Sequence, residues 1–283
     1  IIGKDLNPNS FLFRYIKFLN IFLHNQKPNP QVLESVYSYL TENRQSIDSS
    51  FVLDEDQDCQ EFLTALLNKF QDECSSFEYV NHHLFSNYVH VRIDVHDCGH
   101  YAITSNVEQL LQLGFDFTHF SEKEMKSKAL KTFILEDMIA TDCKREIQYT
   151  CPGCPECKTK KQSIQTRVFH KYPRILIIQL KRNAFDSKGE QILLRDNVIY
   201  KRYMTLPEEE DRREVYFELI SLIVYKGSRI TKGHYYTYIL NSDKKWYLLD
   251  DADTNKVQHV TAKEVINQKN PAYILVYKKC SED

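Results

Sequence analysis

A histidine and an aspartate near the carboxyl-terminal end of the sequence are residue types that perform acid–base chemistry together. His234 follows Gly233, and Asp250 is the first residue of an Asp-Asp pair. A histidine oriented by a carboxylate is the general base of thiol and hydroxyl hydrolases. For an isolated Gly-His-Tyr the ordinary interpretation is instead a strand histidine beside a surface turn. The surrounding elements must therefore decide between the two.

These two residues stand at the ends of predicted neighbouring strands. Three runs rich in Val, Ile, Tyr and Trp, over 216–225, 234–240 and 245–249, are separated by turn residues and predict an antiparallel meander. A short connection joins the second run to the third, so that the start of one faces the end of the other. We therefore expect His234 and Asp250 to lie within hydrogen-bond reach of each other.

Other segments predict a chain of mixed α/β class. Apolar residues at helical spacing predict helices over 11–23, 31–40 and 59–70. A near-continuous apolar run predicts a central strand over 175–180. Residues 226–232, just before the histidine, contain glycine and serine and predict a mobile loop.

Length, composition and charge narrow the class of protein. A chain of 283 residues with 42% hydrophobic residues can bury the core of one large domain. The net charge of −2 gives no electrostatic basis for binding nucleic acid or membranes, and no apolar run reaches the length of a membrane span. Of eight cysteines, three lie within 151–157 and the others are scattered, which favours reduced thiols over a secreted disulfide framework. We expect an intracellular protein of the cytoplasm or nucleus.

The segments around the histidine are GHYYTYI from Gly233, KWYLLDD from Lys245 and AYILVY from Ala272. In this order they resemble the histidine box of the ubiquitin-specific proteases, the papain-like cysteine isopeptidases that remove ubiquitin. The resemblance implies that His234 is the general base and that Asp250 orients it. It also implies an α/β (α+β) fold of the papain-like type, with a helical thumb, β fingers and a β palm.

A second motif, DQDCQEF, opens the helix predicted over 59–70. It resembles the family's Q-Q-D-A-x-E-F box, with an Asp and a Cys in place of the usual Gln and small residue. The resemblance implies that Asp58 and Glu61 receive the tail of ubiquitin, which carries arginines ahead of its terminal Gly-Gly. The alternative is that both acids only favour the amino-terminal end of a core helix.

The fingers of this family carry a zinc ribbon built from two separate C-x2-C pairs. The resemblance implies Cys98, Cys154 and Cys157 as metal ligands, whereas the partner position of Cys98 holds a valine. A tetrahedral zinc site needs four ligands, and the candidates for the fourth are Cys151, His96 and His100. The alternative is a set of reduced structural thiols without metal. Catalysis itself needs no cofactor.

The family's cysteine box, G-N-T-C-Y-x-N-S, is missing from this sequence. A cysteine isopeptidase needs a thiolate at a helix amino terminus with an amide donor just upstream, and none of the eight cysteines has this context. One explanation places the box upstream of Ile1, because 11–23 resembles the helix that follows it. The other makes 7–11 a decayed box with Phe11 at the nucleophile's position. We favour the first, and predict that the chain as given is inactive.

The predicted organisation is a single domain over 283 residues. It has a thumb over 1–80, fingers over 81–100 and 141–172, and a palm over 101–140 and 173–283. The expected partners are ubiquitin or ubiquitinated proteins, in the setting of a larger protein complex. The expected function is hydrolysis at the carboxyl terminus of ubiquitin if the nucleophile lies upstream. The alternative is an inactive pseudoenzyme that acts as a ubiquitin-binding or scaffold module.

Overall fold

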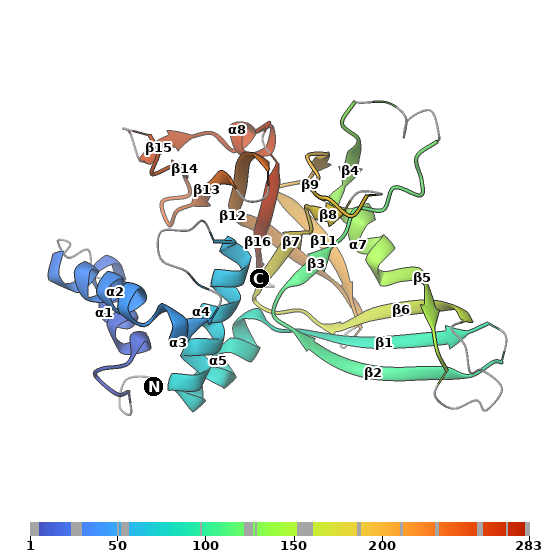
Figure 1. The fold of residues 1–283 in the computed structure, drawn as a ribbon, viewed down its shortest axis with the longest axis horizontal. Helices are drawn as coiled ribbons and strands as arrows, with labels where there is room; N and C mark the ends of the chain where they lie inside the picture. Colours follow the sequence, from blue (N-terminus) through green and yellow to red (C-terminus); the bar gives the residue numbers. More distant parts are fainter. Residues whose placement is uncertain are drawn as a thin grey trace. The chain divides into compact units, whose positions relative to one another are not determined.

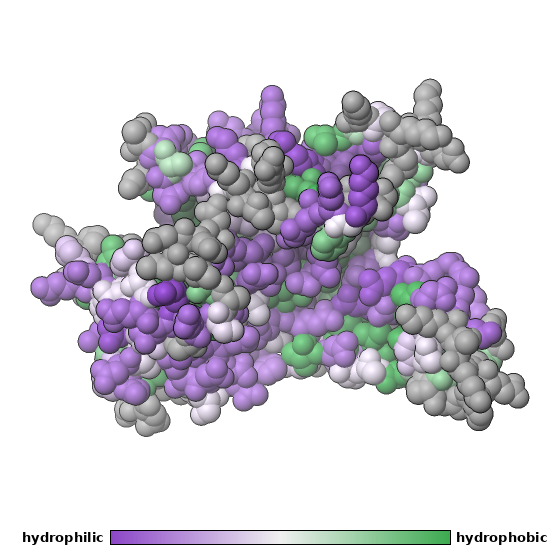
Figure 2. Space-filling model, viewed as in Figure 1, coloured by the Kyte–Doolittle hydropathy of each residue, from purple (hydrophilic) through white to green (hydrophobic). Residues whose placement is uncertain are grey.

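The structure, a computed structural model, divides into two units at residues 1–83 and 84–283. The residues that it describes are 6–23, 30–49, 51, 57–96, 98–121, 127, 129–151, 161–185, 188–209, 212–229, 232–253, 257–269 and 271–280. The chain combines helices and sheets, as predicted (Figure 1). On the face shown in Figure 2, most described side chains are hydrophilic and the apolar ones form small patches. No helix among these residues is long and apolar enough to cross a membrane.

The first unit is helical and is built around aromatic side chains. Its helices are α1 (Phe11–Leu23), α2 (Pro30–Glu42), α3 (Arg44–Ile47), α4 (Cys59–Glu73) and most of α5 (Ser75–Phe85). The ring of Phe11 stacks on those of Tyr39 and Phe70, with centroids 5.1 and 5.7 Å apart. Glu73 of α4 accepts the backbone N–H of Leu12 at 2.8 Å. This bond joins the first turn of α1 to the last turn of α4.

A four-stranded antiparallel sheet begins the second unit. Its strands lie in the order β2 (Tyr101–Glu108), β1 (Asn87–Val95), β6 (Lys161–Lys171) and β5 (Lys144–Tyr149). Alternate residues of β1, including Val89 and Val91, are buried, while His90 and Arg92 point to the opposite face. This period-2 pattern is what a sheet with one covered face requires.

An eight-stranded sheet forms the body of the second unit. Its main path runs β15 (Val257–Val260), β14 (Trp246–Leu249), β13 (Lys232–Leu240), β12 (Arg213–Arg229), β16 (Ala272–Lys279), β7 (Ile175–Leu180) and β3 (Leu111–Leu113), and β11 (Tyr203–Glu208) pairs with β12. The strand predicted over 175–180 is confirmed as β7. It pairs with β16 on one side and β3 on the other, so both of its edges are covered.

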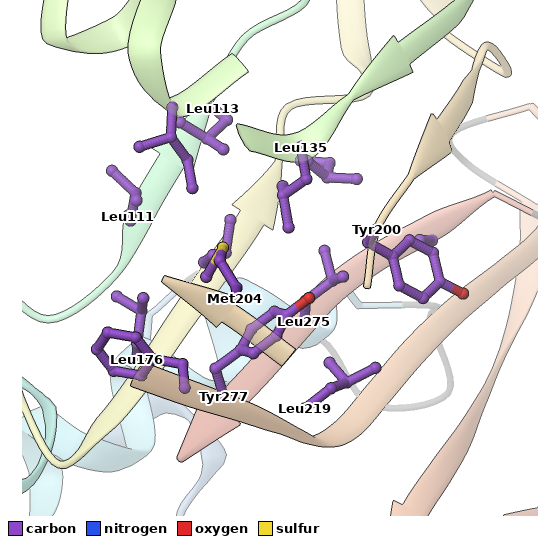
Figure 3. Packing of buried hydrophobic residues seen from close by; sticks show 14 of the residues in the cluster. Leu111, Leu113, Leu135, Leu176, Tyr200, Met204, Leu219, Leu275 and Tyr277 are labelled. Atoms are coloured by element: carbon purple, nitrogen blue, oxygen red, sulfur yellow. The ribbon is translucent and has the colours of Figure 1, made fainter. Parts of the chain in front are cut away.

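Short elements complete the second unit. They are the strand pairs β4 (Thr132–Ile134) with β10 (Asn197–Ile199) and β8 (Asn183–Phe185) with β9 (Gln191–Leu193), and the helices α7 (Leu135–Cys143) and α8 (Ala262–Ile266). The β4–β10 pair and the two helices, together with the sheets, enclose one large apolar core. Figure 3 shows side chains from several elements meeting there, among them Leu111, Leu113, Leu135, Leu176, Met204, Leu219, Leu275 and Tyr277. Each buried leucine contributes about 1.5–3 kcal/mol.

The predicted meander is present as β12, β13 and β14, but one prediction beside it was wrong in part. Residues 226–232 were expected to form a loop, whereas β12 continues to Arg229 and β13 begins at Lys232. Lys226 pairs with His234, and Gly227 with Gly233. The ladder between the two strands outweighs the local preference of glycine and serine for turns.

Glu208, at the end of β11, is a buried carboxylate with two hydrogen-bond donors and a further cation nearby. It accepts the N–H of Tyr172 at 2.8 Å and the Nζ of Lys279 at 2.9 Å, and the Nε of Arg213 lies 3.6 Å away. Only 3% of the residue is exposed. Burial acts to raise the pKa of Glu208, but the hydrogen bonds and the two cations outweigh it, so the pKa lies below its ordinary value.

We predict that Glu208→Ala lowers the free energy of unfolding by about 1–3 kcal/mol, because the N–H of Tyr172 loses its buried acceptor. The exposed Glu214→Ala is the control and should stay within about 0.5 kcal/mol of wild type. Because the folded-state pKa of Glu208 is depressed, its contribution is complete above its ordinary pKa of 4.5 and is lost as pH falls through the folded value. Urea unfolding at pH 7 and at lower pH measures both effects. Equal losses for the two variants would contradict this role.

Candidate active site

The meander brings His234 and Asp250 together. His234 pairs with Lys226 near the start of β13, and the ladder between β13 and β14 reaches Thr237 opposite Leu249. Asp250 follows directly after that last pair and is therefore a diagonal neighbour of the histidine on the same face. The Nε2–H of His234 donates to Oδ1 of Asp250 at 2.6 Å. The predicted contact between the two side chains is present.

The turn after β14 holds the carboxylate in place. Oδ1 of Asp250 also accepts the N–H of Ala252 at 3.0 Å, and the carboxylate of Asp251 lies 3.7 Å from Nε2 of His234. Partial burial alone would raise the pKa of Asp250. The hydrogen bonds from His234 and Ala252 and the positive charge of Lys226 outweigh burial, so the pKa lies below its ordinary value. An ionised Asp250 can therefore stabilise a protonated imidazole.

Both partners remain accessible to a reacting group. The side chain of His234 is 32% exposed and that of Asp250 is 20% exposed. Because the carboxylate holds Nε2, the ring nitrogen that is available for proton exchange with another group is Nδ1. Within the described part of the second unit, the side chains of Asp250 and Asp251 each place a carboxylate oxygen within 4.8 Å of a ring nitrogen of His234.

Gly233 allows an unusually close approach of a tyrosine beside the histidine. A Cβ at position 233 would overlap the phenol ring of Tyr225, which is 5% exposed. The ring of Tyr225 packs on Tyr235 at 5.0 Å, and Tyr235 packs on Tyr273 at 5.6 Å. The hydroxyl of Tyr273 accepts Nε2–H of Gln179, a residue of β7, at 3.1 Å. A chain of packed rings thus connects the start of β13 to the centre of the sheet.

The predicted tail-binding acids lie at the amino-terminal end of α4, in the first unit. Oδ1 of Asp58 accepts the N–H groups of Gln60 and Glu61 at 2.7 and 3.3 Å, so Asp58 is the N-cap of the helix. Glu61 is exposed, and its side chain takes no part in that cap. Partial burial, followed by the charges of Asp58 and Asp48, raises the pKa of Glu61. A cation bound here would relieve that repulsion.

The structure describes some of the predicted metal ligands but not all of them. The ligand atoms of Cys98, His100 and Cys151 all lie within 4.8 Å of one another. Cys154 and Cys157 lie outside the described residues, and their role stays a prediction. The three residues that do converge include Cys151, predicted as a candidate fourth ligand, and His100, another candidate.

Phe11, which one explanation placed at the nucleophile's position, is a core residue. It is 1% exposed and its ring stacks on those of Tyr39 and Phe70. Such packing accounts for an aromatic residue at this position without reference to a cysteine box.

Two contributions to the site were missed in the sequence. The N–H of Ala252 bonds to the Asp250 side chain two residues earlier, an Asx turn that the Asp-Asp-Ala-Asp run could have indicated. The contact of Tyr225 with Gly233 has no local signal, because it depends on the pairing of two strands.

Comparisons with known proteins identify similar sequences and a similar fold. A family model described as "Ubiquitin carboxyl-terminal hydrolase" matches residues 12–277. The probable ubiquitin carboxyl-terminal hydrolase 16 of Schizosaccharomyces pombe is 26% identical over 240 residues, which cover 80% of this chain and 48% of the relative. Ubiquitin carboxyl-terminal hydrolase 8 of Saccharomyces cerevisiae is 27% identical over 136 residues, which cover 44% of this chain and 28% of the relative. The chain thus spans less than half the length of either relative.

Solved structures share the fold. The SAGA Ubp8/Sgf11/Sus1/Sgf73 DUB module bound to ubiquitin aldehyde matches 99% of this chain and 62% of the other, with a TM-score of 0.72 and 19% identity. A SAGA DUB module of the same four proteins, with a variant of Ubp8 and bound to monoubiquitin, matches 98% of this chain and 60% of the other, with a TM-score of 0.70 and 18% identity. These matches confirm the predicted fold class.

We predict that Gly233→Ala lowers the free energy of unfolding by about 1–3 kcal/mol, because the new methyl group overlaps the buried ring of Tyr225. Gly114→Ala is the matched control, since a Cβ there meets nothing within 4 Å. In a double-mutant cycle the cost should shrink when Tyr225→Ala is already present. Chemical denaturation measures all four variants. A cost that does not depend on residue 225 would rule out the close approach.

Proposed function

Because the chain belongs to the ubiquitin carboxyl-terminal hydrolase family, we propose that it recognises ubiquitin and contributes the general base for hydrolysis at the ubiquitin carboxyl terminus. The observation that carries the proposal is the 2.6 Å hydrogen bond between His234 and Asp250 in a partly exposed position. A histidine with a purely structural role could be fully buried, whereas the side chain of His234 is 32% exposed.

The proposed reaction is acyl transfer to a cysteine thiolate. The thiolate attacks the carbonyl carbon of the terminal glycine of ubiquitin, and the imidazolium of His234 protonates the departing lysine amine. The neutral imidazole then takes a proton from water as its oxygen attacks the thioester carbonyl, and the cysteine leaves as a thiolate, which restores the thiolate and the imidazolium. Asp250 holds the ring and stabilises its charged form. None of the eight cysteines of this sequence has the context of the nucleophile, so the proposal assigns that role to none of them.

The setting of the protein is part of the same proposal. The matched structures hold Ubp8 together with Sgf11, Sus1 and Sgf73, and we extend to this chain a place in a larger protein complex. An intracellular location, in the cytoplasm or nucleus, fits the cysteines: none of the six within the described ranges forms a disulfide.

The acids of α4 support the recognition of a basic tail. Asp58 caps the helix and Glu61 lies in its first turn, and the pKa of Glu61 is raised by burial and by neighbouring acids. The capping role of Asp58 does not exclude a second role, because a carboxylate oxygen can accept more than one hydrogen bond. We therefore retain both acids as receptors for the arginines of the ubiquitin tail.

A structural zinc ion is the second part of the proposal. Cys98, His100 and Cys151 supply three converging donors of the types that zinc prefers, and a structural site needs four. Cys98 and Cys151 also pack with the buried Val95, as reduced structural thiols would. If zinc is bound, it would fix the connection between β1 and β2 against the segment that follows β5.

We predict that Asp58→Asn combined with Glu61→Gln weakens ubiquitin binding by at least about 30-fold, because losing one side of a charge pair that becomes buried in the complex costs about 2–5 kcal/mol. Asparagine is an equally good N-cap, so stability should not change. Asp72→Asn, an exposed position on the same helix, is the control and should bind as wild type does.

Calorimetric titration of ubiquitin, together with thermal melting, separates the possibilities. If the double variant binds as tightly as wild type, both acids serve only the helix. If wild type itself shows no binding, the proposal that this chain recognises ubiquitin is wrong.

We predict that the purified chain contains zinc that depends on Cys98, and that chelation lowers its melting temperature because metal binding stabilises the folded state. Cys98→Ser should lose the ion and its response to chelator. Cys280→Ser, at an exposed position, should keep both. Elemental analysis and melting curves provide the measurements. Wild-type protein without zinc and without a chelator effect would show that these residues are reduced structural thiols.

A further inference from the structure

Three potential metal ligands meet where the four-stranded sheet adjoins the turn between β11 and β12. His90 lies on β1, His170 lies at the end of β6, and Glu209 directly follows β11. The register between β1 and β6 shifts between Tyr88 and Val89, and this irregularity leaves His170 between two paired positions. His170 and His90 therefore share the exposed face of the sheet, opposite the buried Val89.

The geometry of the three side chains is convergent. The two imidazole rings stack with centroids 4.9 Å apart and an interplanar angle of 16°. Oε2 of Glu209 lies 3.3 Å from Nδ1 of His90 and 3.8 Å from Nδ1 of His170. One ligand atom from each of the three residues lies within 4.8 Å of the other two. Two Nδ1 atoms thus face the same carboxylate oxygen.

The backbone fixes Glu209 in this position without the help of its side chain. Its N–H donates to the carbonyl of Phe169, the residue before His170, at 2.9 Å. The preceding residue, Glu208, points inward and is paired with Lys279 at 2.9 Å. The nearby lysine is therefore engaged by the buried carboxylate, while the carboxylate of Glu209 is directed to the two histidines.

We propose that His90, His170 and Glu209 form a binding site for a divalent transition-metal cation, with Zn²⁺ as the ion to test. Bonds of about 2.05 Å at the tetrahedral angle place zinc ligands about 3.3 Å apart, close to the two distances from Glu209. Two imidazoles and a carboxylate favour zinc, copper or nickel over magnesium or calcium. Three protein ligands leave a further coordination position for water or for a donor from a partner.

This site is separate from the cysteine-containing group at the far end of β1. The strand advances about 3.3 Å per residue, so the five steps from His90 to Val95 cover about 17 Å, and Cys98 lies beyond them. A bound ion would connect β1 and β6 with the β11–β12 turn. The four-stranded sheet and the edge of the eight-stranded sheet would then be held together at this point.

The test is a calorimetric titration of Zn²⁺ into the full chain, with the bound ions counted by elemental analysis. Wild type is expected to bind one ion that His170→Gln does not bind. Glu209→Gln should bind it at least about 10-fold more weakly. His119→Gln is the matched control, because His119 is 75% exposed and lies 3.6 Å from Asp116 without a second histidine in that pair. It should bind as wild type does.

Two variants distinguish the two sites: His170→Gln should lose the ion at the histidine site, and Cys98→Ser should lose the ion at the cysteine-containing group. All four proteins should show the same melting temperature without added zinc, since the side chains of His90 and His170 are 45% and 39% exposed. The proposal is overturned if His170→Gln binds as many ions as wild type with the same affinity. It is also overturned if wild type binds zinc only at the cysteine-containing group, so that Cys98→Ser binds none.

Discussion

The arrangement of the second unit depends on one buried cation. Arg182, just after β7, is 1% exposed. Its Nε donates to the carbonyl of Ala272 at 2.5 Å, and its Nη1 donates to the carbonyls of Leu194 and Asp196 at 2.9 and 3.0 Å. The guanidinium also lies over the ring of Phe115, at 5.1 Å. Burial lowers the pKa of Arg182 to about 10, partly offset by the charge of Asp196, so the group remains charged at neutral pH.

That cation matters for the site because Ala272 begins β16. This strand pairs with β12, and β12 in turn sets the register of β13, on which the histidine stands. An arginine in an apolar interior is costly unless its donors find acceptors. Here Nε and Nη1 reach backbone carbonyls from segments far apart in sequence, whereas the buried Nη2 has no partner among the described residues. The three bonds that are made position the start of β16 and, through two ladders, the two partners of the candidate active site.

The sequence predicted those features that depend on interactions between residues close together in the chain. The helix expected over 59–70 is α4, because an acidic N-cap and an apolar face act within a few turns. The pair of His234 and Asp250 was predictable because one short hairpin joins their strands. The strands that replace the loop expected over 226–232 depend on partners in the ladder and were not predictable locally. The meeting of His90 and His170 with Glu209 depends on a strand irregularity at His170 and on a distant turn, neither of which leaves a pattern that can be read in sequence.

Glu208 and Glu209 are neighbours in the chain that face opposite sides of β11. The first neutralises cations in the interior, and the second approaches two histidines at the surface. Alternate residues of a strand point to opposite faces, so a residue gained within β11 would place Pro207 at the buried position and deprive Lys279 of its carboxylate. A residue lost from β11 would instead move another member of the Glu-Glu-Glu run into each of the two positions. The strand should therefore tolerate a deletion better than an insertion, because the repeated glutamate supplies a spare carboxylate in one direction only.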